Sequence, residues 1–258
     1  MIDFLSTIGR RVIALFSIAG RLAIFVASAF SHCVRPPIYF RNVFQQFWTI
    51  GYNSLPVVGM TAFFTGAVLA LQASVGFSKL TAPAAIPLLV IVSMTRELGP
   101  VLASLMVAGR VGAAIAAELG TMRVTEQIDA LDTLATNPMK YLVVPRVLAG
   151  LIMMPALVLV ADVIGVMGGF IVSSFILKFN ESAYLINTIQ NTHFKDIFSG
   201  LVKAAVFGLI ITTLGCFNGY NSRGGAQGVG LATTNAVVYA SVLILFFDYF
   251  LTELFLTQ

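Results

Sequence analysis

Long apolar stretches, separated by short polar ones, dominate the chain beyond residue 44. A helix needs about 20 apolar residues to cross the hydrocarbon core of a bilayer. The pattern predicts five spanning helices, at residues 47–77, 87–117, 147–177, 199–218 and 231–254. The first three are longer than a bilayer requires, but half of 47–77 or 87–117 is too short to span alone. We therefore expect single helices that tilt, protrude or kink, with Pro56, Pro100 and Pro155 as kink sites.

Residues 1–34 follow a different pattern, in which polar side chains share one arc of a helix: Asp3, Ser6, Arg10, Ser17, Arg21 and Ser28. Such a helix is suited to lie in the headgroup plane of a membrane. A signal peptide is the alternative, because Arg10-Arg11 precede an apolar run and Ala27-Ser28-Ala29 resembles a cleavage site. Arg21 interrupts that run, so an amphipathic interfacial helix is favoured, and Pro36-Pro37 ends it.

Composition supports the membrane class. The 258 residues are 58% hydrophobic and 10% charged, with a mean hydropathy of +0.94, whereas soluble domains contain about 25% charged residues. The net charge of +4 is scattered, which favours contact with anionic lipid over nucleic acid. Cys33 and Cys216 are far apart in apolar surroundings and are predicted to be buried thiols. One all-α membrane domain is therefore expected.

The distribution of basic residues predicts the orientation. Nine lie in the N-terminal region and in the loops after the second and fourth spans, against four on the other side. Basic residues favour the cytoplasm, so the N-terminus is predicted inside and the C-terminus outside. Residues 178–198 then form an outer loop with room for a short helix or two, and His193 is interpreted as a surface residue.

Small residues spaced four apart recur within the spans: Gly109–Ala113, Gly112–Ala116, Gly165–Gly169 and Gly215–Gly219. Such pairs allow helix backbones to approach closely in lipid. They indicate packing within the chain or pairing of two copies, and five helices alone make a thin bundle for a transport path. A homodimer is therefore predicted.

Arg96-Glu97-Leu98-Gly99-Pro100 places an acid and a base inside an apolar segment. A charge at this depth costs at least ~2.5–3.5 kcal/mol, so it indicates either a substrate pathway or an ion pair that ties two helices. Pro100 has no N–H, which frees the Arg96 carbonyl, and a polar cavity could satisfy that group. Arg110 is interpreted as structural or snorkelling, and Asp162 and Asp248 as lone intramembrane acids, the latter near water.

The predicted cytoplasmic loop after the second span carries an apolar stripe of Val124, Ile128, Leu131 and Ala135 beside an acidic stripe of Glu126, Asp129 and Asp132. A short amphipathic helix within residues 118–138 is suited to dock into a groove of a cytoplasmic partner. A solvated charged turn is the alternative, but it has no need of the apolar stripe.

Catalytic motifs are absent from the sequence, which has no phosphate-binding loop, no His-Glu-x-x-His and no Cys/His cluster spaced for a metal. The glycine-rich segment 222–230 is predicted to be a tight turn, because it follows no strand. The chain is therefore not expected to be an enzyme or to hold a cofactor. If ATP drives it, another subunit hydrolyses the ATP.

Several of these stretches together resemble the MlaE (YrbE) family of ABC permeases. The resemblance covers about residues 40–258 and is carried by Arg96–Pro100, Ala108-Gly109-Arg110, Ala117–Met122, Glu126–Leu131, Asn137-Pro138, Pro145-Arg146 and Gly228–Val238. It implies a homodimer of five-span subunits that works with a cytoplasmic ABC ATPase, a STAS-domain protein and a periplasmic ring (hexamer) of MCE domains. It also implies phospholipid movement between the bacterial inner membrane and periplasmic carriers, which maintains outer-membrane lipid asymmetry.

The resemblance also implies roles for individual residues. A lipid cavity at the dimer interface is expected to be lined by Arg96, Glu97, Leu98, Leu69, Gln72, Phe77 and Leu80. Coupling to the ATPase is expected through Glu118, Arg123, Glu126, Gln127, Asp129, Leu131 and Asp132. Two other hypotheses compete with the lipid permease. One is an ion- or proton-coupled carrier of a hydrophobic molecule that uses Arg96, Glu97 and Asp248, and the other is a passive membrane scaffold.

Overall fold

A computed structural model describes residues 2–34, 39–77 and 81–256. Within them, five helical segments are long and apolar enough to cross a membrane, as predicted: Phe40–Gly76, Ala82–Val124, Met139–Ile176, Phe194–Tyr220 and Gly225–Phe255. They are called spans one to five below. The described residues contain helices and no strands, which confirms the all-α class.

Several spans consist of more than one helical element. Span one is α2 (Phe40–Ile50), a 3₁₀ turn (Tyr52–Ser54) and α3 (Leu55–Gly76). Span two is α4 (Ala82–Ser93), a π-helical turn (Met94–Leu98), α5 (Gly99–Val107), a second π turn (Ala108–Gly112) and α6 (Ala113–Val124). Span three is a π turn (Met139–Val143), α8 (Val144–Ile171) and a last π turn (Val172–Ile176).

Two of the three predicted kink sites lie at breaks in a helix. Pro56 lies in the first turn of α3, directly after the 3₁₀ turn, and Pro100 lies in the first turn of α5, directly after the Met94–Leu98 turn. Proline suits these positions because its fixed φ matches the first turn of a helical segment. Pro155 lies inside α8, which continues through it as one α-helix.

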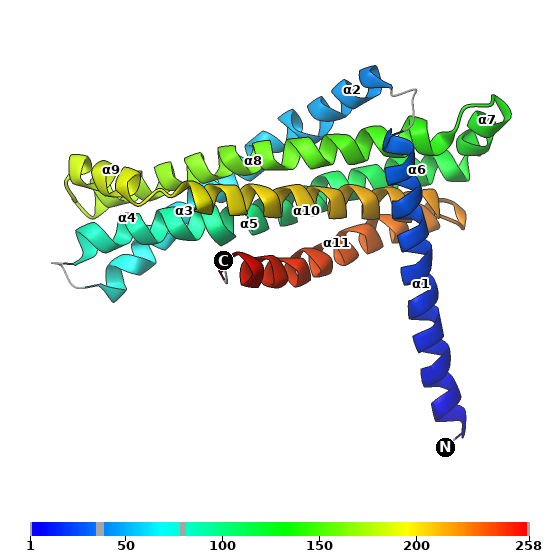
Figure 1. The fold of residues 1–258 in the computed structure, drawn as a ribbon, viewed down its shortest axis with the longest axis horizontal. Coiled ribbons are helices and arrows are strands. Elements are labelled where there is room, and N and C mark those ends of the chain that lie inside the picture. Colours follow the sequence, from blue (N-terminus) through cyan, green and yellow to red (C-terminus); the bar gives the residue numbers. More distant parts are fainter. Residues whose placement is uncertain (1, 35–38, 78–80, 257–258) are drawn as a thin grey trace.

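The spans run side by side along the long axis of the molecule (Figure 1). α7 (Gln127–Thr133) lies at one end, beyond α6. α9 (Glu181–Gln190), the helix in the predicted outer loop, lies at the other end. Span four is α10 (Phe194–Tyr220), and α11 (Gly225–Leu256) contains span five.

The N-terminal helix α1 (Ile2–Val34) crosses the bundle at the α7 end, and its N-terminus extends away from the body (Figure 1). Its C-terminal third is anchored by Phe25, whose ring lies 5.5 Å from that of Phe217, and by fully buried Ala29. Ile13 and Phe16 are more than 70% exposed. Exposed apolar side chains on a helix that crosses the spans are compatible with the predicted interfacial position, where the membrane would cover them.

Small residues bring the spans together, mostly within the chain. A Cβ added at Gly165 would lie 3.2 Å from the Ala62 carbonyl of α3, and one at Gly219 would lie 2.8 Å from the Ala116 carbonyl of α6. Close backbone approach of this kind replaces the hydrophobic drive that lipid cannot supply. A Cβ added at Gly109, by contrast, meets no atom within 4 Å.

The helices extend further than the apolar pattern predicts. Residues 118–124 continue α6, so only Gln127–Thr133 forms a separate helix within the predicted segment 118–138. Span four begins at Phe194 instead of residue 199, and this difference brings Asp196 into the helix. Polar residues at helix ends add no apolar signal, although their backbones continue the hydrogen-bond ladder.

A buried charge cluster as candidate functional site

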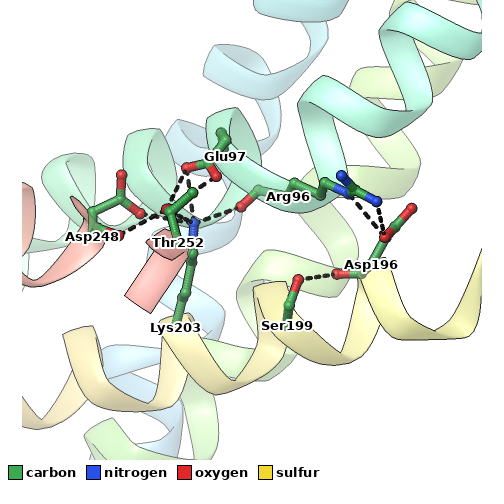
Figure 2. Close-up of polar contacts among 7 residues, drawn as sticks. All are labelled: Arg96, Glu97, Asp196, Ser199, Lys203, Asp248 and Thr252. Atoms are coloured by element: carbon green, nitrogen blue, oxygen red, sulfur yellow. Dashed lines mark hydrogen bonds and ion pairs between the residues drawn. The ribbon is translucent and has the colours of Figure 1, made fainter. Parts of the chain in front are cut away.

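Five charged side chains and one hydroxyl meet among spans two, four and five (Figure 2). The cluster consists of Arg96, Glu97, Asp196, Lys203, Asp248 and Thr252. Three elements supply it: the Met94–Leu98 turn, the first half of α10 and the last part of α11. The sequence predicts a polar site at Arg96-Glu97, and the structure shows which partners complete it.

Arg96 pairs with α10 and not with its neighbour in sequence. Its Nε and Nη2 lie 2.8 and 2.7 Å from Asp196 Oδ1. The Asp196 side chain is 8% exposed and that of Arg96 is 40% exposed. Asp196 therefore holds the guanidinium in place from the protein side, while part of the cation stays open.

Lys203 is the centre of the cluster and is only 1% exposed. Its Nζ donates to Glu97 Oε2 at 2.8 Å, to Thr252 Oγ1 at 2.7 Å and to the Arg96 carbonyl at 3.0 Å. An ammonium has three donors, so these bonds use all of them. Asp248 Oδ1 lies 3.1 Å away as a further counter-charge. Asp248 is therefore bound within the cluster, in contrast to its interpretation as a lone acid near water.

Lys203 also satisfies a backbone group of the π turn. Pro100 offers no N–H to the preceding turn, and the Arg96 carbonyl that this frees accepts from Lys203. The sequence predicts the freed carbonyl, with a polar cavity in place of this lysine. Gly200 lets α10 approach closely, because a Cβ there would overlap the Thr95 carbonyl. The π turn and α10 thus fit together through backbone contacts as well as charges.

A cavity of about 480 Å³ opens beside the cluster. The cluster residues Arg96, Glu97, Asp196, Lys203 and Thr252 line it, together with His193, Lys195, Phe198, Ser199 and Phe255. Charged groups therefore share its wall with two phenyl rings. His193, predicted to be a surface residue, lies at this cavity and precedes α10.

The other predicted lipid-contacting residues lie outside this cavity. Leu98, from the same turn as Arg96, lines an apolar groove of about 480 Å³ with Leu69 and Gln72 of α3. Phe77 lines another hollow, with residues of α4. Leu80 lies outside the described residues. The structure thus brings three of the seven together in one groove and two in the charged cavity.

The predicted coupling residues lie at the α7 end of the molecule (Figure 1). Glu118 pairs with buried Arg146 at 2.9 Å, and Arg123 pairs with Asp129. Of the apolar stripe that motivated the docking prediction, Ile128 is fully buried and Leu131 is half-buried. Packing within the chain therefore covers these two residues of the stripe, whereas its other two, Val124 and Ala135, are exposed. The exposed surface at this end combines polar residues with apolar ones: Glu126, Gln127, Asp129, Asp132, Val124 and Leu134.

Arg110 ties span two to the break in span one. Its Nη2 donates to the Thr49 carbonyl at 2.6 Å and to Ser54 Oγ at 2.7 Å. Thr49 and Ser54 flank the junction between α2 and α3. This contact bears out the structural interpretation of Arg110, because the arginine satisfies a carbonyl that the break leaves without a helical partner.

Sequence reasoning missed Asp196, Lys203 and Thr252 as members of the site. Lys203 is a cation within an apolar run seven residues beyond Asp196, and that spacing places both on one side of a helix. The signal was present, but a span that begins at residue 199 leaves Asp196 in a loop. Thr252 offers no such signal, since a threonine is common in an apolar helix.

Five spans and a cavity that combines charged groups with phenyl rings are typical of a membrane permease. The chain belongs to the MlaE permease family, whose model, described as Permease MlaE, matches residues 43–254. It is thus the permease subunit of an ABC transporter and not the ATPase.

Relatives from three lineages match most of the chain. A probable ABC transporter permease protein of Rickettsia bellii is 56% identical over 255 residues, which are 99% of this chain and 98% of the relative. The intermembrane phospholipid transport system permease protein MlaE of Haemophilus influenzae is 34% identical over 98% of both chains. The protein TRIGALACTOSYLDIACYLGLYCEROL 1, chloroplastic, of Arabidopsis thaliana is 37% identical over 84% of this chain and 62% of its own.

Proposed function

We propose that this permease moves phospholipids between the bacterial inner membrane and periplasmic carriers, and thereby maintains outer-membrane lipid asymmetry. One observation carries the proposal. The Met94–Leu98 turn borders a charged cavity through Arg96 and Glu97 and an apolar groove through Leu98. A phospholipid needs both environments, one for its headgroup and one for its acyl chains. The name of the Haemophilus influenzae relative supports the same substrate class.

Arg96 is the proposed contact for the lipid phosphate. Asp196 engages it through Nε and Nη2, and its side chain is 40% exposed beside the cavity. A guanidinium held in this way donates charge-assisted hydrogen bonds to phosphate oxygens without first having to be ordered. Lys203 is less suited to the contact, because its three donors are already used.

The proposed assembly includes further subunits. A cytoplasmic ABC ATPase would bind at the α7 end, where Glu126, Gln127 and Asp132 are exposed. The proposal also includes a second copy of this chain, a STAS-domain protein and a periplasmic hexamer of MCE domains. In this arrangement the N-terminus is cytoplasmic and the C-terminus periplasmic, and no nucleic acid takes part.

Transport by the reconstituted complex tests the proposal. The permease and its partner subunits are placed in vesicles with a fluorescent phospholipid, and transfer to a periplasmic carrier is followed with and without ATP. We expect ATP-dependent transfer, and a fall of about tenfold or more for Arg96→Gln, since a hydrogen bond to a charged group contributes ~1.5–3 kcal/mol. Lys178→Gln, a cation of the predicted outer loop that lines neither hollow, is the matched control.

The same assay separates the alternatives. Transfer that runs on an ion gradient without the ATPase would replace the proposal with a secondary carrier. Equal rates for Arg96→Gln and Lys178→Gln would remove Arg96 from the lipid path. A complex that moves no phospholipid under any condition would refute the substrate class.

A further inference from the structure

Asp162 is a buried carboxyl group that the charge cluster does not use. It lies inside α8, is 7% exposed, and its Oδ1 has no hydrogen-bond partner among the described residues. A Cβ added at Gly99 would overlap this oxygen. The Gly99 N–H in turn bonds to the Met94 carbonyl and closes the π turn. The Asp162 carboxyl therefore touches the turn that carries Arg96 and Glu97.

The contact between Asp162 and Gly99 lies apart from the charged cavity. A small void of about 10 Å³ lies beside Asp162, lined by neighbouring Ala161 with Met94, Leu98 and Gly99 of the turn region and with residues of α3 and α5. It shares no lining residue with the charged cavity. The π turn thus borders two separate spaces, the charged cavity through Arg96 and Glu97 and the small void through Met94 and Leu98.

Among the described residues, the surroundings of Asp162 contain no counter-charge for an ionised carboxylate. α3, α4 and α5 have no charged residues. Arg96 and Glu97 of the turn are paired with Asp196 and Lys203 of α10. Among the side chains that the structure describes, the other charged groups on elements that pack against α8 lie towards the ends of the bundle: Arg21, His32, Arg41, Lys140, Glu181 and Lys195. Arg146 of α8 itself is paired with Glu118. An unpaired carboxylate at this depth is costly, and such a group instead keeps its proton.

We propose that Asp162 is a positioning residue, a neutral carboxylic acid wedged between α8 and the Met94–Leu98 turn that sets where Arg96 and Glu97 point. Its ionisation would place a charge in an apolar wall and push α8 away from the turn, so transport would fall at alkaline pH. The link to transport rests on the proposed function, while the protonated state of Asp162 does not.

Two measurements on the full complex test the inference. An infrared difference spectrum between the wild type and Asp162→Asn should show the carbonyl band of a protonated carboxylic acid in the wild type. Asp162→Asn, which is neutral and of the same shape, should keep most of the transport and lose the alkaline fall. Asp162→Ala should reduce transport about 5–150-fold, the range usual for coupling between two sites.

Glycine variants provide an independent arm. Gly99→Ala places a Cβ against both the Asp162 carboxyl group and the Met94 carbonyl of the turn, so it should reduce transport at least as much as Asp162→Ala does. Gly109→Ala, also in span two but with free space around it, should not. A missing acid band, or an Asp162→Asn variant as impaired as Asp162→Ala at every pH, would overturn the inference. If the wild-type complex moves no phospholipid, the proposed function fails, but the infrared measurement still decides the state of Asp162.

Discussion

Replacing Lys203 with methionine perturbs the charge cluster most directly. Methionine keeps the length and the apolar stem of the side chain but removes the ammonium, which donates to Glu97, Thr252 and the Arg96 carbonyl and also neutralises Asp248. The substitution leaves two carboxylates facing each other without a cation. Span four would lose its bonds from this side chain to spans two and five.

The magnitude follows from the burial of the partners. Breaking a buried ion pair by removing one partner costs about 3–5 kcal/mol. The Glu97 side chain is 39% exposed and that of Asp248 is 19% exposed, so solvent screens part of the loss and we expect about 2–4 kcal/mol. For a chain of this length each kcal/mol corresponds to about 2–4 °C, which gives a fall in Tm of roughly 4–16 °C.

Thermal unfolding of the permease in lipid nanodiscs measures this change, with Lys195→Met as the control, since Lys195 is an exposed lysine on the same helix. The double variant Lys203→Met/Glu97→Gln should recover part of the loss, because it also removes one of the uncompensated charges. If Lys203→Met unfolds at the same temperature as Lys195→Met, or if the double variant shows only the sum of the two losses, Lys203 does not organise the cluster.

Further predictions concern the packing and the α7 end. Gly208→Val should lower Tm by several degrees in thermal unfolding, because a Cβ there overlaps the Gly150 carbonyl, whereas the same change at Gly109 should be nearly neutral. Arg110→Ala should free the α2–α3 junction and increase protease cleavage near Ser54 without preventing insertion into the membrane. Asp132→Lys, on the exposed face, should weaken co-purification with the ATPase at unchanged Tm, whereas Ile128→Asp, at a fully buried position, should lower Tm by itself.

The sequence predicted the helical class, the number of spans and the position of the charged site, because these depend on apolar length and on the cost of a charge in lipid. It did not predict which side chains pair with Arg96 and Glu97. Arg96 and Glu97 are adjacent in sequence, yet each pairs with α10 about 100 residues away. Only the packing of α10 against the π turn determines that pairing, and it depends on backbone contacts such as that of Gly200 with Thr95.

The loop after span two shows a second limit of prediction from sequence, which concerns the residues that cover an apolar face. Apolar residues spaced three or four positions apart predict a helical face, but they do not predict what covers that face. Ile128 is buried by other residues of the same chain. The predicted spans are shorter than the helices for a related reason. Hydropathy identifies the apolar part of a helix and not its full hydrogen-bonded length. Asp196 was lost from the site through that difference alone.

The order of synthesis has a consequence for how the cluster assembles. Glu97 leaves the ribosome 155 residues before Thr252, an interval of about 8–30 s at ~5–20 residues per second. During that time Glu97 and then Lys203 lack the Thr252 hydroxyl and the Asp248 carboxylate that complete the cluster. Completion of the last helix therefore closes the network, so nascent chains stalled before Asp248 should be the ones that membrane quality-control proteases degrade.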